Sequence, residues 1–244
     1  MDASIAIHEI YASIQGESTF AGLPCILIRL SGCPLRCSYC DSAFAFAPGK
    51  RWPLDEVIER VDALARPWFL RPCSSRLPLV ELTGGEPLLQ PAALDLMRRL
   101  CDAGYTTLLE TSGALDISPV DPRVRRIMDL KCPSSGESER NRWDNIARLR
   151  ATDEVKLVIG TLEDYRWAVR ILSDHNLARI CPVLFSWAHP IESAARDPSL
   201  RTPPADHTPI SQRALAEQII ADALPVRFQL QIHKAIWPPS QRGV

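Results

Sequence analysis

The stretch SGCPLRCSYCDSAF, residues 31–44, places Cys33, Cys37 and Cys40 within eight positions. It follows CILIRL (25–30), whose apolar and β-branched residues predict a strand that leads into this loop. A structural zinc loop usually supplies two cysteine pairs, and no second pair is present. An iron–sulfur cube takes one ligand per iron, so three thiolates leave one iron open. The spacing favours a cluster, although zinc with a further ligand from elsewhere stays open.

The composition indicates an ordinary soluble protein. The chain has 244 residues, is 46% hydrophobic and 23% charged, and carries a formal net charge of -1. This balance gives no reason to expect nucleic acid or a membrane as a partner. The N-terminus lacks a secretory pattern, so we expect a cytoplasmic protein with one domain over residues 1–244. We interpret the five cysteines outside the loop as small buried side chains, namely Cys25, Cys73, Cys101, Cys132 and Cys181.

Strand-like and helix-like segments alternate along the chain, a pattern typical of α/β folds with a parallel sheet. The predicted strands are 25–30, 79–83, 106–110, 125–131, 154–160, 180–185 and 226–233. Helices are predicted at 54–65, 91–104 and 209–223. Residues 189–208 contain four prolines and predict a surface loop, whose role stays open together with that of Ser186.

Side-chain alternation in four of these strands distinguishes an open sheet from a barrel. One face of each strand is apolar, through Ile26, Ile28 and Leu30; Val80 and Leu82; Val155, Leu157 and Ile159; and Phe228, Leu230 and Ile232. The opposite faces carry Arg29; Glu81 and Thr83; Lys156; and Arg227, Gln229, Gln231 and His233. A parallel sheet covered by helices on both faces would be apolar on both. We therefore predict a partial (β/α) barrel of about six parallel strands with a polar mouth, the alternative being exposed edge strands.

The cysteine loop and three further motifs resemble the radical S-adenosylmethionine superfamily. An aromatic residue, Tyr39, precedes the last cysteine, and Thr83 leads into the sequence GGEP (84–87). Glu110-Thr111-Ser112-Gly113 and Asp129-Leu130-Lys131 stand at the ends of the next two predicted strands. The resemblance implies that Cys33, Cys37 and Cys40 bind a [4Fe-4S] cluster whose fourth iron binds S-adenosylmethionine.

The same resemblance implies which residues bind the cofactor. These are Tyr39, Cys40, Asp41, Gly84, Gly85, Glu110, Ser112, Asp129, Lys131 and Ser134. Glycines 84 and 85 would let the backbone approach the methionyl group closely, because no Cβ intrudes. Two alternatives stay open: Asp129 and Lys131 can form an internal ion pair, and Glu86 can cap a helix or loop.

Further segments narrow the resemblance to the 7-carboxy-7-deazaguanine synthase family. They are EIYASIQGE (9–17), CDS (40–42), QLQIHK (229–234), IWP (236–238) and RGV (242–244). This family implies conversion of 6-carboxy-5,6,7,8-tetrahydropterin to 7-carboxy-7-deazaguanine with loss of ammonia, a step toward queuosine-type nucleosides. It implies that hydrogen is abstracted from C6 and that S-adenosylmethionine is regenerated. It also implies a homodimer and an electron donor such as flavodoxin or ferredoxin.

The family resemblance also implies which residues bind the pterin. These are Ile14, Gln15, Gly16, Glu17, Arg29, Thr83, Gln231, His233 and the C-terminal Val244. Gln15 and Glu17 present the acceptors and donors that a pterin edge requires, and Arg29 suits the substrate carboxylate. Arg29 would alternatively pair permanently with Glu17 or Glu81, and His233 would simply be hydrogen-bonded.

The family requires Mg²⁺, which a hydroxyl just after the cluster loop binds. The family commonly has threonine at this position, whereas this chain has Ser42, which keeps the oxygen ligand. Two other functions stay open. One is an enzyme that installs a glycyl radical on a partner protein, which needs no carboxylate-reading arginine. The other is a zinc-binding scaffold without catalysis.

Overall fold

A computed structural model of the chain describes residues 4–70, 78–191, 196–238 and 241–243. Within these ranges nine strands form one sheet in the order β3-β1-β2-β4-β5-β6-β7-β8-β9. The strands are β1 (Ser4–Ile14), β2 (Pro24–Leu30), β3 (Lys50–Pro53), β4 (Leu79–Gly84), β5 (Thr107–Thr111), β6 (Arg125–Leu130), β7 (Glu154–Ile159), β8 (Val183–Trp187) and β9 (Arg227–Gln229).

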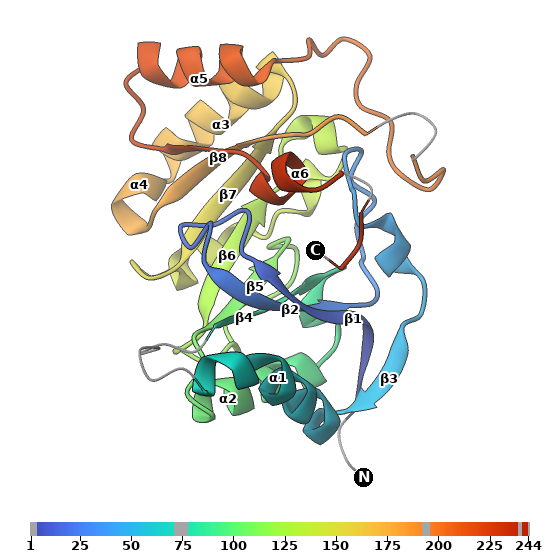
Figure 1. Cartoon of the computed structure of the whole chain (residues 1–244). Coiled ribbons are helices and arrows are strands. Elements are labelled where there is room, and N and C mark those ends of the chain that lie inside the picture. Colours follow the sequence, from blue (N-terminus) through green and yellow to red (C-terminus); the bar gives the residue numbers. More distant parts are fainter. Residues whose placement is uncertain (1–3, 71–77, 192–195, 239–240, 244) are drawn as a thin grey trace.

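Strands β2, β4, β5, β6, β7, β8 and β9 are paired in parallel. Strands β1 and β3 extend the sheet beyond β2 as an antiparallel edge. The sheet curves between two groups of helices but does not close, because its outer strands β3 and β9 are not paired with each other (Figure 1). The predicted partial barrel is confirmed. It has seven parallel strands instead of about six, and the sequence analysis missed β1 and β3.

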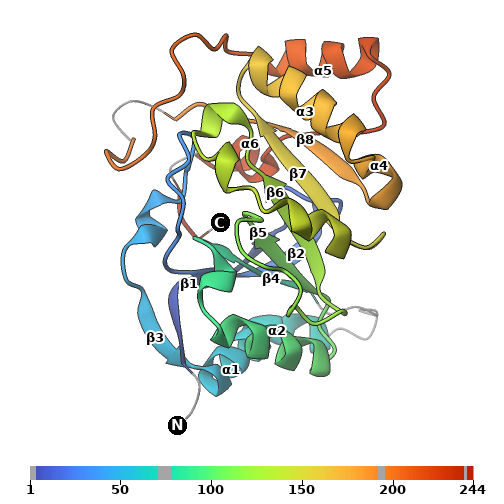
Figure 2. The same ribbon diagram turned by 180° about the vertical axis from the view of Figure 1, so that it is seen from behind.

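The described helices are α1 (Leu54–Phe69), α2 (Ala92–Asp102), α3 (Leu162–Asp174), α4 (Leu177–Ile180), α5 (Gln212–Ala221) and α6 (Ile232–Ile236). Of these six described helices, α1 to α5 lie outside the sheet and α6 lies at its open end. Short 3₁₀ turns complete the connections: η1 (Ala43–Phe46), η2 (Pro87–Leu89), η3 (Pro133–Ser135), η4 (Ser138–Arg140) and η5 (Trp143–Arg148). Figures 1 and 2 show α1 and α2 at one end of the molecule and α3, α4 and α5 at the other.

Two apolar cores hold these layers together. In α1 the buried residues Leu54, Val57, Val61 and Ala65 recur at helical spacing and join the core under β1, β2 and β4. The second core lies between β6, β7 and β8 and the helices α3 and α5. Helix α3 begins at a capping box in which Thr161 and Asp164 bond each other's backbone N–H. The helices thus pack against the apolar faces of the strands, and the polar faces point into the partial barrel.

The alternation predicted for three strands is confirmed, and for the last strand it is wrong. Strand β9 ends at Gln229, and the chain then turns into α6, so His233 is helical. Phe228, expected against helices, is 37% exposed, whereas Gln229 is buried. The short strand lies at the edge of the sheet, where Phe228 is only partly covered. The strand predicted at 180–185 begins later, at Val183, because Ile180 ends α4.

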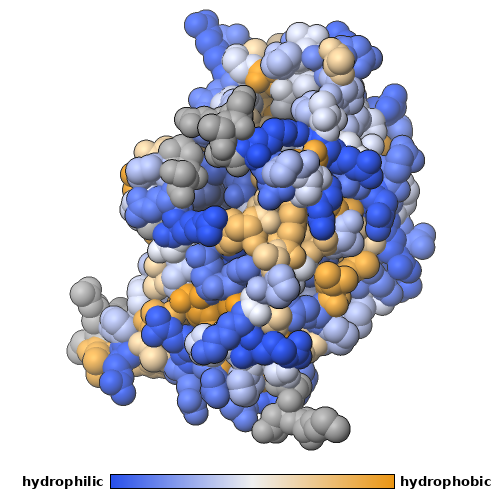
Figure 3. All heavy atoms as spheres, turned by 90° about the vertical axis from the view of Figure 1, so that its right-hand side faces the viewer, coloured by the Kyte–Doolittle hydropathy of each residue, from blue (hydrophilic) through white to orange (hydrophobic). Residues whose placement is uncertain are grey.

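The face that carries β3 is mainly hydrophilic, with an apolar area near its middle (Figure 3). Among the described residues, no helix combines the length and apolar character that crossing a bilayer requires.

Candidate active site

A cavity of about 650 Å³ opens at the carboxyl ends of the parallel strands. Parallel barrels hold their chemistry at this end, because the strand-to-helix loops converge there. The wall is formed by the loop after β1, the cysteine loop, the inward faces of β4 to β8, and α6. The inward residues Arg29, Glu81, Thr83 and Lys156 all line it, as strand alternation predicts.

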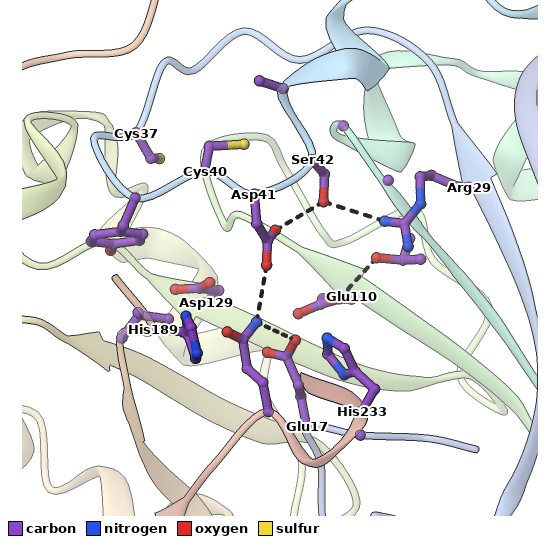
Figure 4. Close-up of a pocket in the computed structure, with 18 of the residues that line it drawn as sticks. Glu17, Arg29, Cys37, Cys40, Asp41, Ser42, Glu110, Asp129, His189 and His233 are labelled. Atoms are coloured by element: carbon purple, nitrogen blue, oxygen red, sulfur yellow. Dashed lines mark hydrogen bonds between the residues drawn. The ribbon is translucent and has the colours of Figure 1, made fainter. Parts of the chain in front are cut away.

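Cys33, Cys37 and Cys40 all line this cavity, and Figure 4 shows Cys37 and Cys40 together on one side of it. Hydrogen bonds to backbone carbonyls shape their loop. The Arg36 side chain donates through Nη1 to the carbonyl of Cys33 at 2.8 Å, and the Cys40 amide donates to the carbonyl of Cys37 at 3.1 Å. The Ser38 hydroxyl fixes the loop to η3 by donating to the carbonyl of Ser134 at 2.6 Å. The loop therefore presents its thiols toward the strand ends.

Burial raises the pKa of Cys37 to about 11 and that of Cys40 to about 12. Such thiols ionise when a metal stabilises the thiolate. Among the described residues, no group of three or more histidine, cysteine or acidic side chains is arranged so that it could hold one metal ion. An iron–sulfur cube does not need that arrangement, since each thiolate binds a different iron. The three-cysteine set therefore fits a cluster.

Gly84 and Gly85 bring the end of β4 against β2 and the cysteine loop. Gly84 has φ +123°, and a Cβ there would lie 2.5 Å from the backbone nitrogen of Leu30. A Cβ at Gly85 would lie 1.9 Å from the carbonyl oxygen of Gly32. Both glycines line the cavity. Packing of the chain against itself thus requires glycine here, in addition to the predicted approach of a cofactor.

Glu86 organises the next strand end. It is fully buried, and its carboxylate accepts from the amides of Leu88 and Ser112 at 3.0 and 2.7 Å. It also accepts from the hydroxyls of Ser112 at 2.6 Å and Thr111 at 2.9 Å. Of the alternatives for Glu86, the cap is the one observed. The Ser112 hydroxyl is occupied, although Ser112 still lines the cavity.

Asp129 and Lys131 form the anticipated ion pair, with Nζ 2.8 Å from Oδ2, and both line the cavity. In the part of the chain that the structure describes, Asp129 Oδ1 and the Tyr39 hydroxyl are buried without a hydrogen-bond partner. Unsatisfied buried polar atoms indicate that a polar group completes the site. Ser134 lies outside the cavity lining, and its amide and hydroxyl are both bonded to Asp164.

The loop after β1 forms the opposite wall. The Gln15 side chain accepts from the amides of Glu17 and Ser18 at 2.9 Å and donates to Glu81 at 3.1 Å. The amide oxygen therefore shapes the loop and the amide nitrogen contacts Glu81, while Gln15 also lines the cavity; its contact with a ligand stays a prediction. A Cβ at Gly16 would lie 2.5 Å from His233 Nδ1, so glycine allows α6 to pack here.

Arg29 has neither of the partners considered for it. Its Nε donates to Glu9 at 2.7 Å and its Nη2 to the Tyr11 hydroxyl at 3.0 Å, while its Nη1 is 3.4 Å from Ser42 Oγ. The alternative of a permanent pair with Glu17 or Glu81 is wrong, because β1 lies directly beside β2 and supplies Glu9. Arg29 still faces the cavity, beside Ser42 (Figure 4).

Helix α6 is joined to the cysteine loop by polar contacts. Gln231 Nε2 donates to Glu17 at 2.7 Å and to Asp41 at 3.2 Å (Figure 4). Lys234 forms an ion pair with Asp41. Burial opposes ionisation of Asp41, but Lys234 lowers its pKa well below the usual range. The Ser42 hydroxyl donates to Asp41 at 3.0 Å, so two oxygen groups stand together next to Cys40.

One basic and one acidic side chain of the cavity floor, Lys156 and Glu81, have no role predicted from the sequence. Lys156 is ion-paired with Glu17, Glu110 and Asp129. Burial raises the pKa of Glu81 to about 8, and repulsion from Glu110 adds to the rise. Their inward position was predictable from strand alternation, but the partners were not, because those come from distant segments. Val244 lies outside the described residues.

The loop after β8 also contributes to the cavity. His189, Pro190, Ile191, Arg196 and Asp197 line it, as does Ser186 at the end of β8. Arg196 Nη1 donates to the carbonyl of Ser38 at 2.7 Å, so this segment contacts the cysteine loop.

Comparison with known proteins supports this arrangement. Residues 27–134 match the Radical SAM superfamily. A 7-carboxy-7-deazaguanine synthase of Chlorobaculum tepidum is 41% identical over 100% of this chain and 99% of its own, and one of Koribacter versatilis is 40% identical over 98% and 99%. The chain belongs to the 7-carboxy-7-deazaguanine synthase family.

Solved structures agree with this family at the level of fold. The crystal structure of QueE from Escherichia coli has a TM-score of 0.66 at 20% identity, over 93% of this chain and 94% of that one. SuiB from Streptococcus suis, solved bound to S-adenosylmethionine, has a TM-score of 0.54 at 14% identity, over 81% of this chain and 48% of that one. The predicted radical S-adenosylmethionine fold is thereby confirmed.

Proposed function

We propose that this protein converts 6-carboxy-5,6,7,8-tetrahydropterin to 7-carboxy-7-deazaguanine with loss of ammonia, a reaction of 7-deazapurine and queuosine biosynthesis, as a single-domain enzyme. The observation that carries the proposal is the 41% sequence identity with a 7-carboxy-7-deazaguanine synthase over 100% of this chain. A cavity lined by three clustered thiols supports it. The name of those relatives states the product, and the cavity of about 650 Å³ is where we propose that the substrate binds.

Cys33, Cys37 and Cys40 would hold a [4Fe-4S] cluster, and S-adenosylmethionine would bind beside it. When bound, these groups supply a carbon-centred radical able to remove hydrogen from the substrate. The residues proposed to bind the cofactor are Tyr39, Cys40, Asp41, Gly84, Gly85, Glu110, Ser112, Asp129, Lys131 and Ser134. The free Asp129 oxygen and Tyr39 hydroxyl support this assignment. Ser134 would act through Asp164 and not by direct contact.

The pterin would lie between the loop after β1 and α6. The residues proposed to bind it are Ile14, Gln15, Gly16, Glu17, Arg29, Thr83, Gln231, His233 and Val244. All of them within the described ranges line the cavity. Glu17 accepts hydrogen bonds, and the Arg29 guanidinium retains donors for the substrate carboxylate. Thr83 donates to Glu110 at 2.8 Å and so connects the pterin and cofactor walls.

Ser42 would bind Mg²⁺. The chain supplies few oxygens here, Ser42 Oγ and the neighbouring Asp41 carboxylate. Mg²⁺ commonly keeps several waters and takes further oxygens from its substrate, so this small donor set suits it. We further propose a cytoplasmic homodimer reduced by flavodoxin or ferredoxin.

The test is anaerobic reconstitution with iron and sulfide, followed by incubation with 6-carboxytetrahydropterin, S-adenosylmethionine, Mg²⁺ and a reductant. We expect 7-carboxy-7-deazaguanine by mass spectrometry, and substrate deuterated at C6 should pass label into recovered S-adenosylmethionine. The variant Cys37→Ser should lose product, while Cys101→Ser, outside the cavity, should keep it. Absence of product from the reconstituted wild type would contradict the proposal.

A further inference from the structure

The cavity floor concentrates negative charge around one buried cation. Glu17 from the loop after β1, Glu110 from β5 and Asp129 from β6 point into the same part of the cavity (Figure 4). The Lys156 side chain on β7 is 3% exposed and reaches all three. Its Nζ lies 3.0 Å from Glu17 Oε2 and 3.7 Å from Asp129 Oδ2, and it is hydrogen-bonded to Glu110.

The register of the sheet explains why one lysine contacts three carboxylates. Lys156 is paired with Asp129 on β6, and Glu110 lies one strand further, on β5. Glu17 lies across the cavity, and its other carboxylate oxygen accepts from Gln231, which directly precedes α6, at 2.7 Å. Lys156 therefore links the loop after β1 to the central strands β5 and β6.

A buried carboxylate without a compensating cation is strongly destabilised and tends to take up a proton or move toward water. Burial opposes ionisation of Glu110, but Lys156 lowers its pKa to about 2. The surrounding carboxylates in turn hold the pKa of Lys156 well above its usual value, despite its burial. Lys156 and Glu110 thus stabilise each other's charged form.

Resting on the proposed function, we infer that Lys156 is a positioning residue for the pterin: its ammonium holds the Glu17 side chain in place as a hydrogen-bond acceptor facing the substrate ring. Lys156 acts through Glu17, and it also joins the pterin wall to the cofactor wall, because the same ammonium bonds Glu110. No single motif in the sequence joins these residues, since Glu17 and Lys156 are 139 positions apart.

A double-mutant cycle tests this role, because only a role exercised through Glu17 makes the two substitutions non-additive. The dissociation constant of 6-carboxypterin, a fluorescent analogue, is measured for wild type, Lys156→Met, Glu17→Gln and the double variant. We expect Lys156→Met to weaken binding about tenfold or more in the wild type. In the Glu17→Gln background, the same change should weaken binding less than about twofold. Lys156→Arg, which keeps the cation, should stay within about threefold of the wild type.

Circular dichroism and thermal melts establish that each variant is folded. Should Lys156→Met not fold, Lys156→Leu gives the same cycle, because leucine also removes the ammonium and its hydrogen bond to Glu17. Equal weakening by the lysine substitution in both backgrounds, or no weakening in either, would overturn the inference alone. Failure of the wild type to bind 6-carboxypterin and to turn over the tetrahydropterin would overturn the proposed function and the inference with it.

Discussion

At the scale of single residues, the cavity is a set of charges whose ionisation depends on burial. Glu81 shows this most clearly. It is 2% exposed, contacts the Gln15 amide, and lies near a second carboxylate, Glu110. Each of these surroundings except the Gln15 hydrogen bond disfavours its charged form. Glu81 is therefore a neutral acid at the bottom of the cavity near neutral pH.

We predict that Glu81→Gln stabilises the protein more at high pH than at low pH. The pKa of Glu81 rises from 4.5 to about 8 on folding, so between these values the folded state binds the extra proton. Stability therefore falls as pH rises through this window, and glutamine removes that loss. Thermal melts should show a larger gain in Tm at pH 9 than at pH 5. Equal Tm shifts at both pH values would contradict the assignment.

At the scale of elements, the decisive feature is how closely the β4 end approaches the cysteine loop. The sequence predicts this strand, its loop and the GGEP motif correctly, because apolar alternation and glycine are local signals. It does not predict β1 and β3, which form the antiparallel edge of the sheet, and it extends β9 into α6. The helical conformation of His233 depends on α6, and the partner of Arg29 depends on β1. Neither could therefore be inferred from the local sequence pattern.

The contact between Gly85 and Gly32 yields a prediction on stability. Gly85→Ala places a Cβ 1.9 Å from the Gly32 carbonyl oxygen, and backbone must move to relieve it. We expect a loss of about 2–3 kcal/mol and a lower iron content after reconstitution, because the displaced loop carries Cys33.

Gly104→Ala is the matched control for this prediction. Gly104 has φ +88° with no atom near the added Cβ, so alanine there suffers only the backbone conformation, about 1 kcal/mol. Urea unfolding and iron analysis measure both variants. An iron content that falls equally in the two would contradict the proposed role of the Gly85 contact.

At the scale of the whole molecule, two apolar cores hold an incomplete barrel whose polar faces enclose one cavity. Fold and cluster loop were predictable, because their signals are contiguous in the sequence. The charge network was not, since Glu17, Glu110 and Lys156 come from three distant segments that only the folded sheet brings together. The position of the loop after β8 likewise depends on contact with the cysteine loop.

The central claim is that three cysteines leave one iron of a cluster free for S-adenosylmethionine. Electron–nuclear double resonance on the reduced, reconstituted protein with S-adenosylmethionine carrying ¹⁵N in its amino group tests it most directly. We expect a ¹⁵N hyperfine coupling large enough to require a direct iron–nitrogen bond. A cluster that shows no such coupling at saturating S-adenosylmethionine, or a metal whose ligands all come from the protein, would contradict it.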